Sequence, residues 1–287
     1  MINSNWLARP VILVAWTAGV LLGFTTISSA ETVAGFAKGY VHPPYGASGI
    51  PLLDSFYFRY SDTDHHIQDL AVYPEQGGQI LLAFADKNDD DTYFYSIEHK
   101  RYSLAGGVIT GSFVDFCNGK CLYPLDPPGP DYIFTLRGFR FYFRNGDHQI
   151  NEVGILWEGA GVKTYFNDRN YDDPYVVYVD YAWLPASLVK ETGDISGTEA
   201  GGAQNMLANA NRAIITGFKF DYLGDDVDHE IQDIGIQTRD SDMQVFFGDK
   251  NQDDDFSYLV NYAILAGRIV RPFPLPESPL PPIKAAN

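Results

Sequence analysis

The chain has 287 residues, with 20 Lys and Arg against 37 Asp and Glu, so its formal net charge is −17. This charge argues against binding to nucleic-acid phosphates or anionic membranes, which would repel it, and makes cations the expected counterpart. Hydrophobic residues make up 45% of the chain, aromatic residues 15% and charged residues 20%. That composition excludes a disordered tail and favours a β-rich globular protein with a sizeable core.

Residues 1–30 have the pattern of a secretory signal peptide. Arg9 precedes an apolar run over 11–24, and small polar residues end at Ala30, so we expect cleavage before Glu31. The alternative is a membrane anchor, but the run has about 14 residues where a spanning helix needs roughly 20. We therefore expect a secreted or periplasmic protein with no membrane span after signal removal.

The chain has two cysteines, Cys117 and Cys121, in the sequence CNGKC. A structural zinc site wants four ligands, and a redox CxxC motif has two intervening residues rather than three. Because an exported protein meets an oxidising environment, the pair predicts a disulfide that pins a turn.

One unit occurs three times along the chain. Each copy contains F-x-F-x-(Tyr/Phe), then Asp-His-x-Ile, then Asp-x-Asn-x-Asp-Asp, and the histidines His65, His148 and His229 are 83 and 81 residues apart. Recurrence of this order at a fixed period indicates a repeat architecture. We expect a signal peptide over 1–30, repeats over 31–110, 111–190 and 191–270, and a Pro-rich extended tail over 271–287.

Apolar residues alternate with other residues in segments such as 56–60, 80–84 and 93–97, and at the corresponding positions of the other repeats. This period of two predicts antiparallel strands with one buried face. The expected fold is all-β, with three homologous units of four to six strands, arranged either as tandem small sandwiches or about a pseudo-threefold axis. The third repeat begins with a Gly-, Ala- and Asn-rich segment, 190–211, that predicts a flexible loop, and a helical period is conceivable only over 205–213.

Each acidic motif spaces oxygen ligands at its first, third and fifth positions, as the first half of an EF-hand loop does. A complete EF-hand is excluded because the sixth residue is Asp rather than Gly and the flanks are strands. In an up-and-down meander the Asp-His turn lies at the same end as the acidic loop and can complete the set. The predicted calcium ligands are Asp64, Asp86, Asn88, Asp90, Asp147, Asp168, Asn170, Asp172, Asp228, Asp249, Asn251 and Asp253. The alternative is a solvated Asp-rich turn without metal.

The histidines His65, His148 and His229 follow an aspartate in each repeat. They are expected to support the metal ligands or fix the turn; the alternative, acid–base catalysis, is disfavoured because three equivalent copies do not resemble one specialised active site. Trp157, Tyr171 and Trp183 are candidates for stacking on sugar rings beside an acidic loop, against the alternative of core packing.

Together these patterns predict a secreted, calcium-stabilised β-repeat binding protein that recognises a carbohydrate or another extracellular surface ligand through its acidic loops. The alternatives are a structural or matrix protein with purely structural calcium sites and, less favoured, a secreted hydrolase that uses the Asp-His pairs. Whether the protein is an enzyme stays open, with the balance against it.

Overall fold

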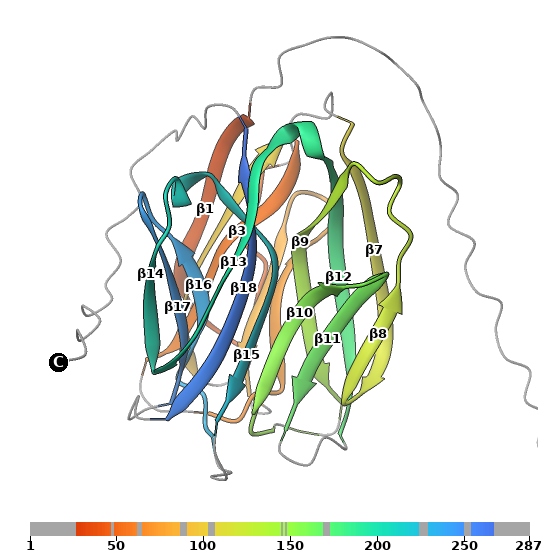
Figure 1. Cartoon of the computed structure of the whole chain (residues 1–287). Helices are drawn as coiled ribbons and strands as arrows, with labels where there is room; N and C mark the ends of the chain where they lie inside the picture. The colour runs from red at the N-terminus through yellow and green to blue at the C-terminus, as the bar shows by residue number, and fades with distance from the viewer. Residues whose placement is uncertain are drawn as a thin grey trace, which may run out of the picture.

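The computed structural model describes residues 27–46, 49–61, 65–86, 91–102, 107–144, 146, 148–168, 173–223, 229–249 and 254–266. These residues form an all-β protein with three six-stranded antiparallel sheets (Figure 1). Within the described residues, two short 3₁₀ helices, η2 (Ala186–Leu188) and η3 (Ala210–Arg212), interrupt the strands. The prediction of an all-β fold with three similar units is therefore confirmed.

Each unit supplies six strands. Unit 1 contains β1 (Ile27–Lys38), β2 (Tyr40–Val41), β3 (Ile50–Tyr60), β4 (Asp69–Pro74), β5 (Ile80–Ala85) and β6 (Thr92–Tyr102). Unit 2 contains β7 (Ile109–Asn118), β8 (Lys120–Pro124), β9 (Tyr132–Phe143), β10 (Glu152–Glu158), β11 (Gly161–Asn167) and β12 (Pro174–Pro185). Unit 3 contains β13 (Val189–Ala200), β14 (Gly202–Met206), β15 (Ala213–Tyr222), β16 (Asp233–Thr238), β17 (Asp242–Gly248) and β18 (Asp255–Leu265).

Every sheet combines three strands of one unit with three strands of another. The first sheet has the order β1-β6-β3-β16-β17-β14, the second β2-β5-β4-β9-β12-β7, and the third β13-β18-β15-β10-β11-β8. The seams between units are the pairs β3–β16, β4–β9 and β10–β15. Because each unit divides its strands between two sheets, the arrangement is pseudo-threefold and not a row of tandem sandwiches.

The corners between sheets are turns of the chain itself. The edge strands β1 and β2, β7 and β8, and β13 and β14 follow one another directly and belong to different sheets. Gly39, Gly119 and Gly201 make these turns with φ of 54°, 73° and 68°, a left-handed conformation that favours glycine. The Cys117–Cys121 disulfide bridges the corner at Gly119, which confirms the expected disulfide at a turn.

Phenylalanines from the three units meet at the centre of the core. Phe56, Phe139 and Phe218 are the first aromatic residues of the three F-x-F motifs, and their ring centroids lie 5.0 to 5.2 Å apart in all three pairs. All three side chains are fully buried in one cluster that includes residues of every sheet. The inward face of each F-x-F strand thus builds a single core shared by the three units.

The segment 190–211 differs from the expected flexible loop, because most of it forms β13 and β14. Its glycines have a packing role: a Cβ on Gly193 would lie 2.5 Å from the Tyr262 hydroxyl, and one on Gly197 would lie 2.6 Å from the Tyr258 hydroxyl. Tyrosine rings of β18 therefore cover these glycines on the neighbouring strand. Likewise, the helical period considered over 205–213 corresponds only to η3.

The expected signal peptide lies outside the described residues except for 27–30, which begin β1, and the expected Pro-rich tail lies outside them entirely. In β1, Ala30 pairs with Lys100 and Glu31 with His99, so the expected cleavage point falls within this strand. None of the described residues belongs to a helix long and apolar enough to cross a membrane.

Removing one ring of the central trio should destabilise the whole protein. Phe139→Ala leaves a cavity among Phe56 and Phe218, and a buried Phe→Ala change costs about 3–5 kcal/mol. Chemical denaturation of Phe139→Ala and of Phe36→Ala, whose native side chain is 65% exposed, measures the contrast. Equal losses in the two variants would contradict the central role of the trio.

Candidate functional site

The strand ends that flank the Asp-His turns and the acidic loops lie at the same end of the molecule, the lower end in Figure 1. Each Asp-His turn joins a central strand to its successor, as between β3 and β4, and each acidic loop joins the last two strands of a unit, as between β5 and β6. The first and sixth residues of the acidic motif sit directly against strand ends. Asp86 follows β5, and Asp91 precedes β6.

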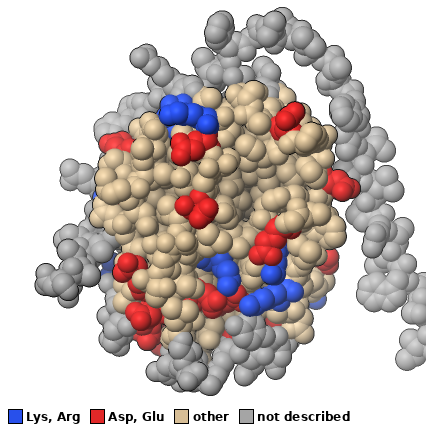
Figure 2. All heavy atoms as spheres, viewed as in Figure 1, with Lys and Arg blue, Asp and Glu red and all other residues tan. Residues whose placement is uncertain are grey.

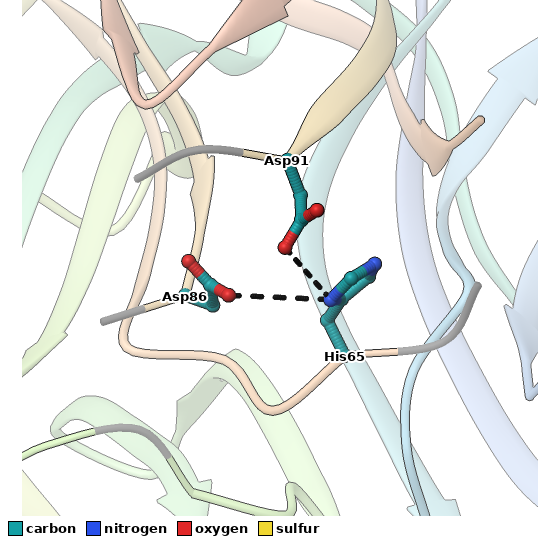
Figure 3. Close-up of side chains that lie close together, drawn as sticks. All are labelled: His65, Asp86 and Asp91. Carbon is teal, nitrogen blue, oxygen red and sulfur yellow. Dashed lines mark ion pairs between the residues drawn. The ribbon is translucent and has the colours of Figure 1, made fainter. Parts of the chain in front are cut away.

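In unit 1, one histidine faces the first and the sixth residue of the acidic loop. His65 Nδ1 lies 3.1 Å from an oxygen of Asp91 and 4.0 Å from one of Asp86. Figure 3 shows both carboxylates turned toward the same ring nitrogen. The histidine and Asp86 side chains are only 13% and 11% exposed, so the group is largely withdrawn from water.

The same arrangement recurs in the other units. His148 Nδ1 lies 3.2 Å from Asp173 and 3.6 Å from Asp168, and His229 Nδ1 lies 2.9 Å from Asp254. In units 1 and 2 the imidazole nitrogen and the two carboxylate oxygens all lie within 4.8 Å of one another. The sixth aspartate, which was not among the predicted ligands, is thus the histidine's partner in every unit.

An aromatic ring of the core strand packs against each histidine. The ring centroids are 4.0 Å apart for Tyr60 and His65, 4.1 Å for Phe143 and His148, and 4.0 Å for Tyr222 and His229. These aromatic residues are the last members of the three F-x-F-x-(Tyr/Phe) motifs. The sequence therefore couples the end of the core strand to the orientation of the imidazole.

Several predicted site residues cannot be placed. Asp249 is described, and it directly follows β17. The residues that lie outside the described ones are Asp64, Asn88, Asp90, Asp147, Asn170, Tyr171, Asp172, Asp228, Asn251 and Asp253. Of the twelve predicted calcium ligands, the structure therefore places Asp86, Asp168 and Asp249.

The Asp-His turns also connect neighbouring units. His65 and Ile231 exchange backbone hydrogen bonds of 3.2 and 3.1 Å, and Ile67 and His148 exchange bonds of 2.9 and 3.1 Å. The motif isoleucines Ile67, Ile150 and Ile231 are each 1% exposed and belong to the common core. The turns that carry the histidines thus close this end of the core.

A buried carboxylate stands at the start of the fourth strand in every unit, and sequence reasoning missed it. Asp69, Glu152 and Asp233 are 0%, 0% and 2% exposed. Each pairs across the sheet with the residue just before an acidic loop, as Asp69 does with Ala85. The signal was present, because all three occupy the last position of Asp-His-x-Ile-x-(Asp/Glu).

The partner of each buried carboxylate is the middle residue of a neighbouring unit's F-x-F motif. Arg140 Nη2 and Nε donate to Asp69 at 2.6 and 3.0 Å. Lys219 Nζ lies 2.6 Å from Glu152. In the third seam the Tyr57 hydroxyl donates to Asp233 at 3.2 Å, so that seam has a neutral partner where the others have a cation.

The tryptophans proposed for sugar stacking do not lie beside an acidic loop. Trp157 pairs with Val162 near the β10–β11 turn, at the end of β10 far from Glu152. Trp183 is 4% exposed, and the two indoles contact each other edge-on at 5.1 Å. Phe134 stacks on Trp157 at 5.5 Å. Both tryptophans therefore contribute to the core, as in the alternative interpretation.

The outer faces of the sheets differ in chemistry. In the third sheet, Lys120, Lys163 and Lys219 place their ammonium groups 5.1 to 5.7 Å from the Tyr165 ring centroid, and acidic partners, including Glu158, lie among them. In the lower half of the face that Figure 2 shows, basic and acidic side chains lie side by side.

In the second sheet, tyrosines surround an arginine. The Arg140 guanidinium lies 5.3 Å from the ring centroid of Tyr142, 5.6 Å from that of Tyr40 and 5.7 Å from that of Tyr178. Tyr73 packs edge-on against Tyr178 at 5.8 Å. We call Tyr40, Tyr73, Tyr142 and Tyr178 with Arg140 the tyrosine face.

Alanines make the tyrosine face compact. Ala71 and Ala83 occupy the two register positions between Arg140 and Tyr40. Both alanines are fully buried. Their small side chains leave room for the arginine side chain to extend across two strands.

Burial raises the pKa of Asp233 to about 7, with a smaller rise from the charge of Asp249 and opposing contributions from Arg59 and the Tyr57 hydrogen bond. Burial likewise raises the pKa of Asp180 to about 6, although Arg137 lies 2.9 Å away and lowers it. At the third seam, where Arg59 lies opposite Asp233 in register, burial outweighs the attraction of this cation and leaves a carboxyl with a pKa of about 7.

Comparison with models of known protein families and with curated protein sequences found no match to this chain.

The raised pKa of Asp233 predicts a specific pH dependence of stability. Its contribution is complete below the ordinary carboxyl pKa of 3.8 and is lost as the pH rises through about 7, because the unfolded chain releases this proton earlier. Asp233→Asn should therefore lose less stability than the native protein between pH 5 and pH 8. Urea unfolding at both pH values, in the presence of a chelator, measures this; parallel losses would contradict it.

Proposed function

We propose that the protein is a calcium-stabilised extracellular binding protein, whose acidic loops hold Ca²⁺ and which recognises carbohydrate. The observation that carries the calcium part is the convergence of a histidine with the first and sixth aspartates of an acidic loop in units 1 and 2. The same loop motif recurs in unit 3. Hard oxygen ligands of this kind suit Ca²⁺.

Electrostatics favours a cation at these loops. Asp86 and Asp91 both face His65, which is positively charged only when it is protonated. The side chain of Asp86 is 11% exposed, so water screens it poorly, and the whole chain carries a net charge of −17. A divalent ion would offset the repulsion between these carboxylates.

The histidine supports the loop and does not itself suit Ca²⁺ as a ligand. The ion pair between His65 and Asp91 and the ring contact between His65 and Tyr60 hold the sixth residue of the loop against the core. Asp86 lies farther from the imidazole, at 4.0 Å, and is the better placed of the two to turn toward a cation. This division of roles extends to His148 with Asp173 and Asp168.

The tyrosine face supports the carbohydrate part of the proposal. Aromatic rings stack on the apolar faces of sugars while phenol hydroxyl groups bond their hydroxyls. Tyr40 is 37% exposed, and the charge of Arg140 is balanced by Asp69. A neutral or weakly polar polysaccharide fits such a surface better than a strongly charged ligand does.

A second candidate is a structural protein in which the cation only rigidifies the repeats. The backbone bonds between His65 and Ile231 and between Ile67 and His148 favour it, because the turns whose histidines contact the acidic loops also join the units. The hydrolase alternative would require turnover that disappears in His148→Ala while stability is kept.

Calcium should raise the thermal stability of the protein, and Mg²⁺ should do so much less. Calcium at 100 times Kd adds about 2.7 kcal/mol per independent site. Asp168→Asn should reduce this gain, whereas Asp126→Asn, an equal charge change at an exposed residue of the opposite end, should leave it unchanged. Thermal unfolding in EDTA, Ca²⁺ and Mg²⁺ measures all three chains. No calcium-specific shift would refute the loop sites.

Tyr142→Ala and Tyr178→Ala should weaken carbohydrate binding by about tenfold each, since a stacked ring contributes on the order of 1 kcal/mol or more. Phe36→Ala, on the outer face of the first sheet, is the matched control. A glycan array in Ca²⁺ identifies the probe, and titrations of the variants follow. Binding lost in chelator with the fold intact supports a cation-dependent site; binding indifferent to both tyrosines refutes the tyrosine face.

A further inference from the structure

The variable positions of the three Asp-His-x-Ile motifs meet on the surface. They are His66, Gln149 and Glu230, each from a different unit. His66 Nε2 lies 3.3 Å from Glu230 Oε1 and 3.3 Å from Gln149 Nε2. The motif isoleucines that follow them are buried beneath, so these three side chains, which we call the axial triad, lie where the pseudo-threefold axis leaves the core.

We propose that the axial triad binds a divalent transition-metal ion of the zinc or nickel class, with one ligand from each unit. This site shares no residue with the calcium loops, so it stands or falls independently of the proposed function. The donors are an imidazole nitrogen, a carboxylate oxygen and an amide oxygen. A nitrogen donor in a small set suits Zn²⁺ or Ni²⁺, whereas Ca²⁺ takes six to eight oxygens.

The distances within the axial triad fit ligands around a metal. With metal–ligand bonds of about 2.1 Å in tetrahedral geometry, adjacent ligand atoms lie about 3.4 Å apart. Glu230 Oε1 lies 3.3 Å from His66 Nε2, and the Gln149 amide nitrogen, whose place the amide oxygen takes when the amide is rotated by 180°, lies at the same distance.

The hydrogen-bonding capacity of the His66 imidazole also favours a bound metal ion. A single ring nitrogen either donates a proton, which suits Glu230, or accepts one, which suits the Gln149 amino group, and it cannot do both. Rotating the Gln149 amide by 180° would place its oxygen toward His66 instead. With the amide in that orientation, a metal ion accepts electron pairs from the imidazole nitrogen, the carboxylate oxygen and the amide oxygen at once.

Solvent access allows a metal to enter and leaves a position for water. The side chains of His66 and Glu230 are 38% and 41% exposed. The backbone beneath them is held in place, because Ile67 pairs with His148 and Ile231 pairs with His65. A bound ion would therefore link three units across seams that are already aligned.

Isothermal titration of the full chain with Zn²⁺, in saturating Ca²⁺, tests the site. The native protein should bind zinc at a site that His66→Gln weakens by at least about tenfold. Gln149→Glu, which supplies a second carboxylate, should tighten the same site. His42→Gln is the matched control, since His42 is 45% exposed and pairs with Glu75 at 2.7 Å without a third ligand.

The outcomes are distinguishable. If His66→Gln titrates like the native protein, the metal binds elsewhere and the proposal is overturned. If Gln149→Glu is less stable without metal and zinc restores its unfolding temperature, the site is supported, because apposed carboxylates need the ion. A Gln149→Glu chain that zinc neither binds more tightly nor stabilises overturns the proposal. The effect of calcium on thermal unfolding is measured separately and tests only the proposed calcium sites in the acidic loops.

Discussion

The contact among Phe56, Phe139 and Phe218 is the interaction on which the rest of the molecule depends. Their ring centroids form a nearly equilateral triangle, and each ring comes from the central strand of a different unit. Since β3, β9 and β15 each pair with a strand of another unit, no unit completes a sheet by itself. Folding of one unit therefore requires the others, and the sheets, seams and corner turns follow from packing three strand sets around one shared core.

Symmetry inside this core contrasts with divergence outside it. The middle residue of F-x-F faces outward and is Tyr57 in one unit, Arg140 in the next and Lys219 in the last. Each meets a buried carboxylate at a seam, but the neighbours differ: tyrosines around Arg140, and lysines around Tyr165 near Lys219. The core residues of the three units must be similar because they pack against one another around the same centre. The residues on the outer faces of the sheets do not contact their equivalents and can therefore differ in charge and size. Ligand recognition is accordingly expected on one face rather than equally on three.

The repeat, the strands and the shared end of the Asp-His turns and acidic loops could be predicted from the sequence, because period-two alternation and motif order are local properties. The assignment of β4 and β5 to a neighbouring unit's sheet could not, since alternation is the same whichever strand lies alongside.

Gly193 and Gly197 suggested a flexible loop for a related reason: only the cross-strand tyrosines reveal that these glycines make room for a ring. Trp157 and Trp183 were predicted to lie beside an acidic loop. Each belongs to a strand that leads away from that end of the sheet, and the sequence alone does not show at which end a side chain lies. The buried carboxylates Asp69, Glu152 and Asp233 were overlooked, although each lies at the same spacing from a histidine. An acidic residue within an apolar strand has no recognisable partner in the sequence until the neighbouring strand is known.

The Asp-His-x-Ile motif shows how a repeat can carry both shared and unique sites. Its histidine stacks on the core strand and its isoleucine enters the core, so both are fixed by packing in all three units. The intervening residue lies on the surface, where His66 meets both Gln149 and Glu230, and it has no such constraint. A loop site arises three times, once per unit, but a site on the axis arises once and can combine three different residues. His66, Gln149 and Glu230 therefore differ without cost to the core, and three different side chains come together at a point where exact symmetry would impose three identical ones.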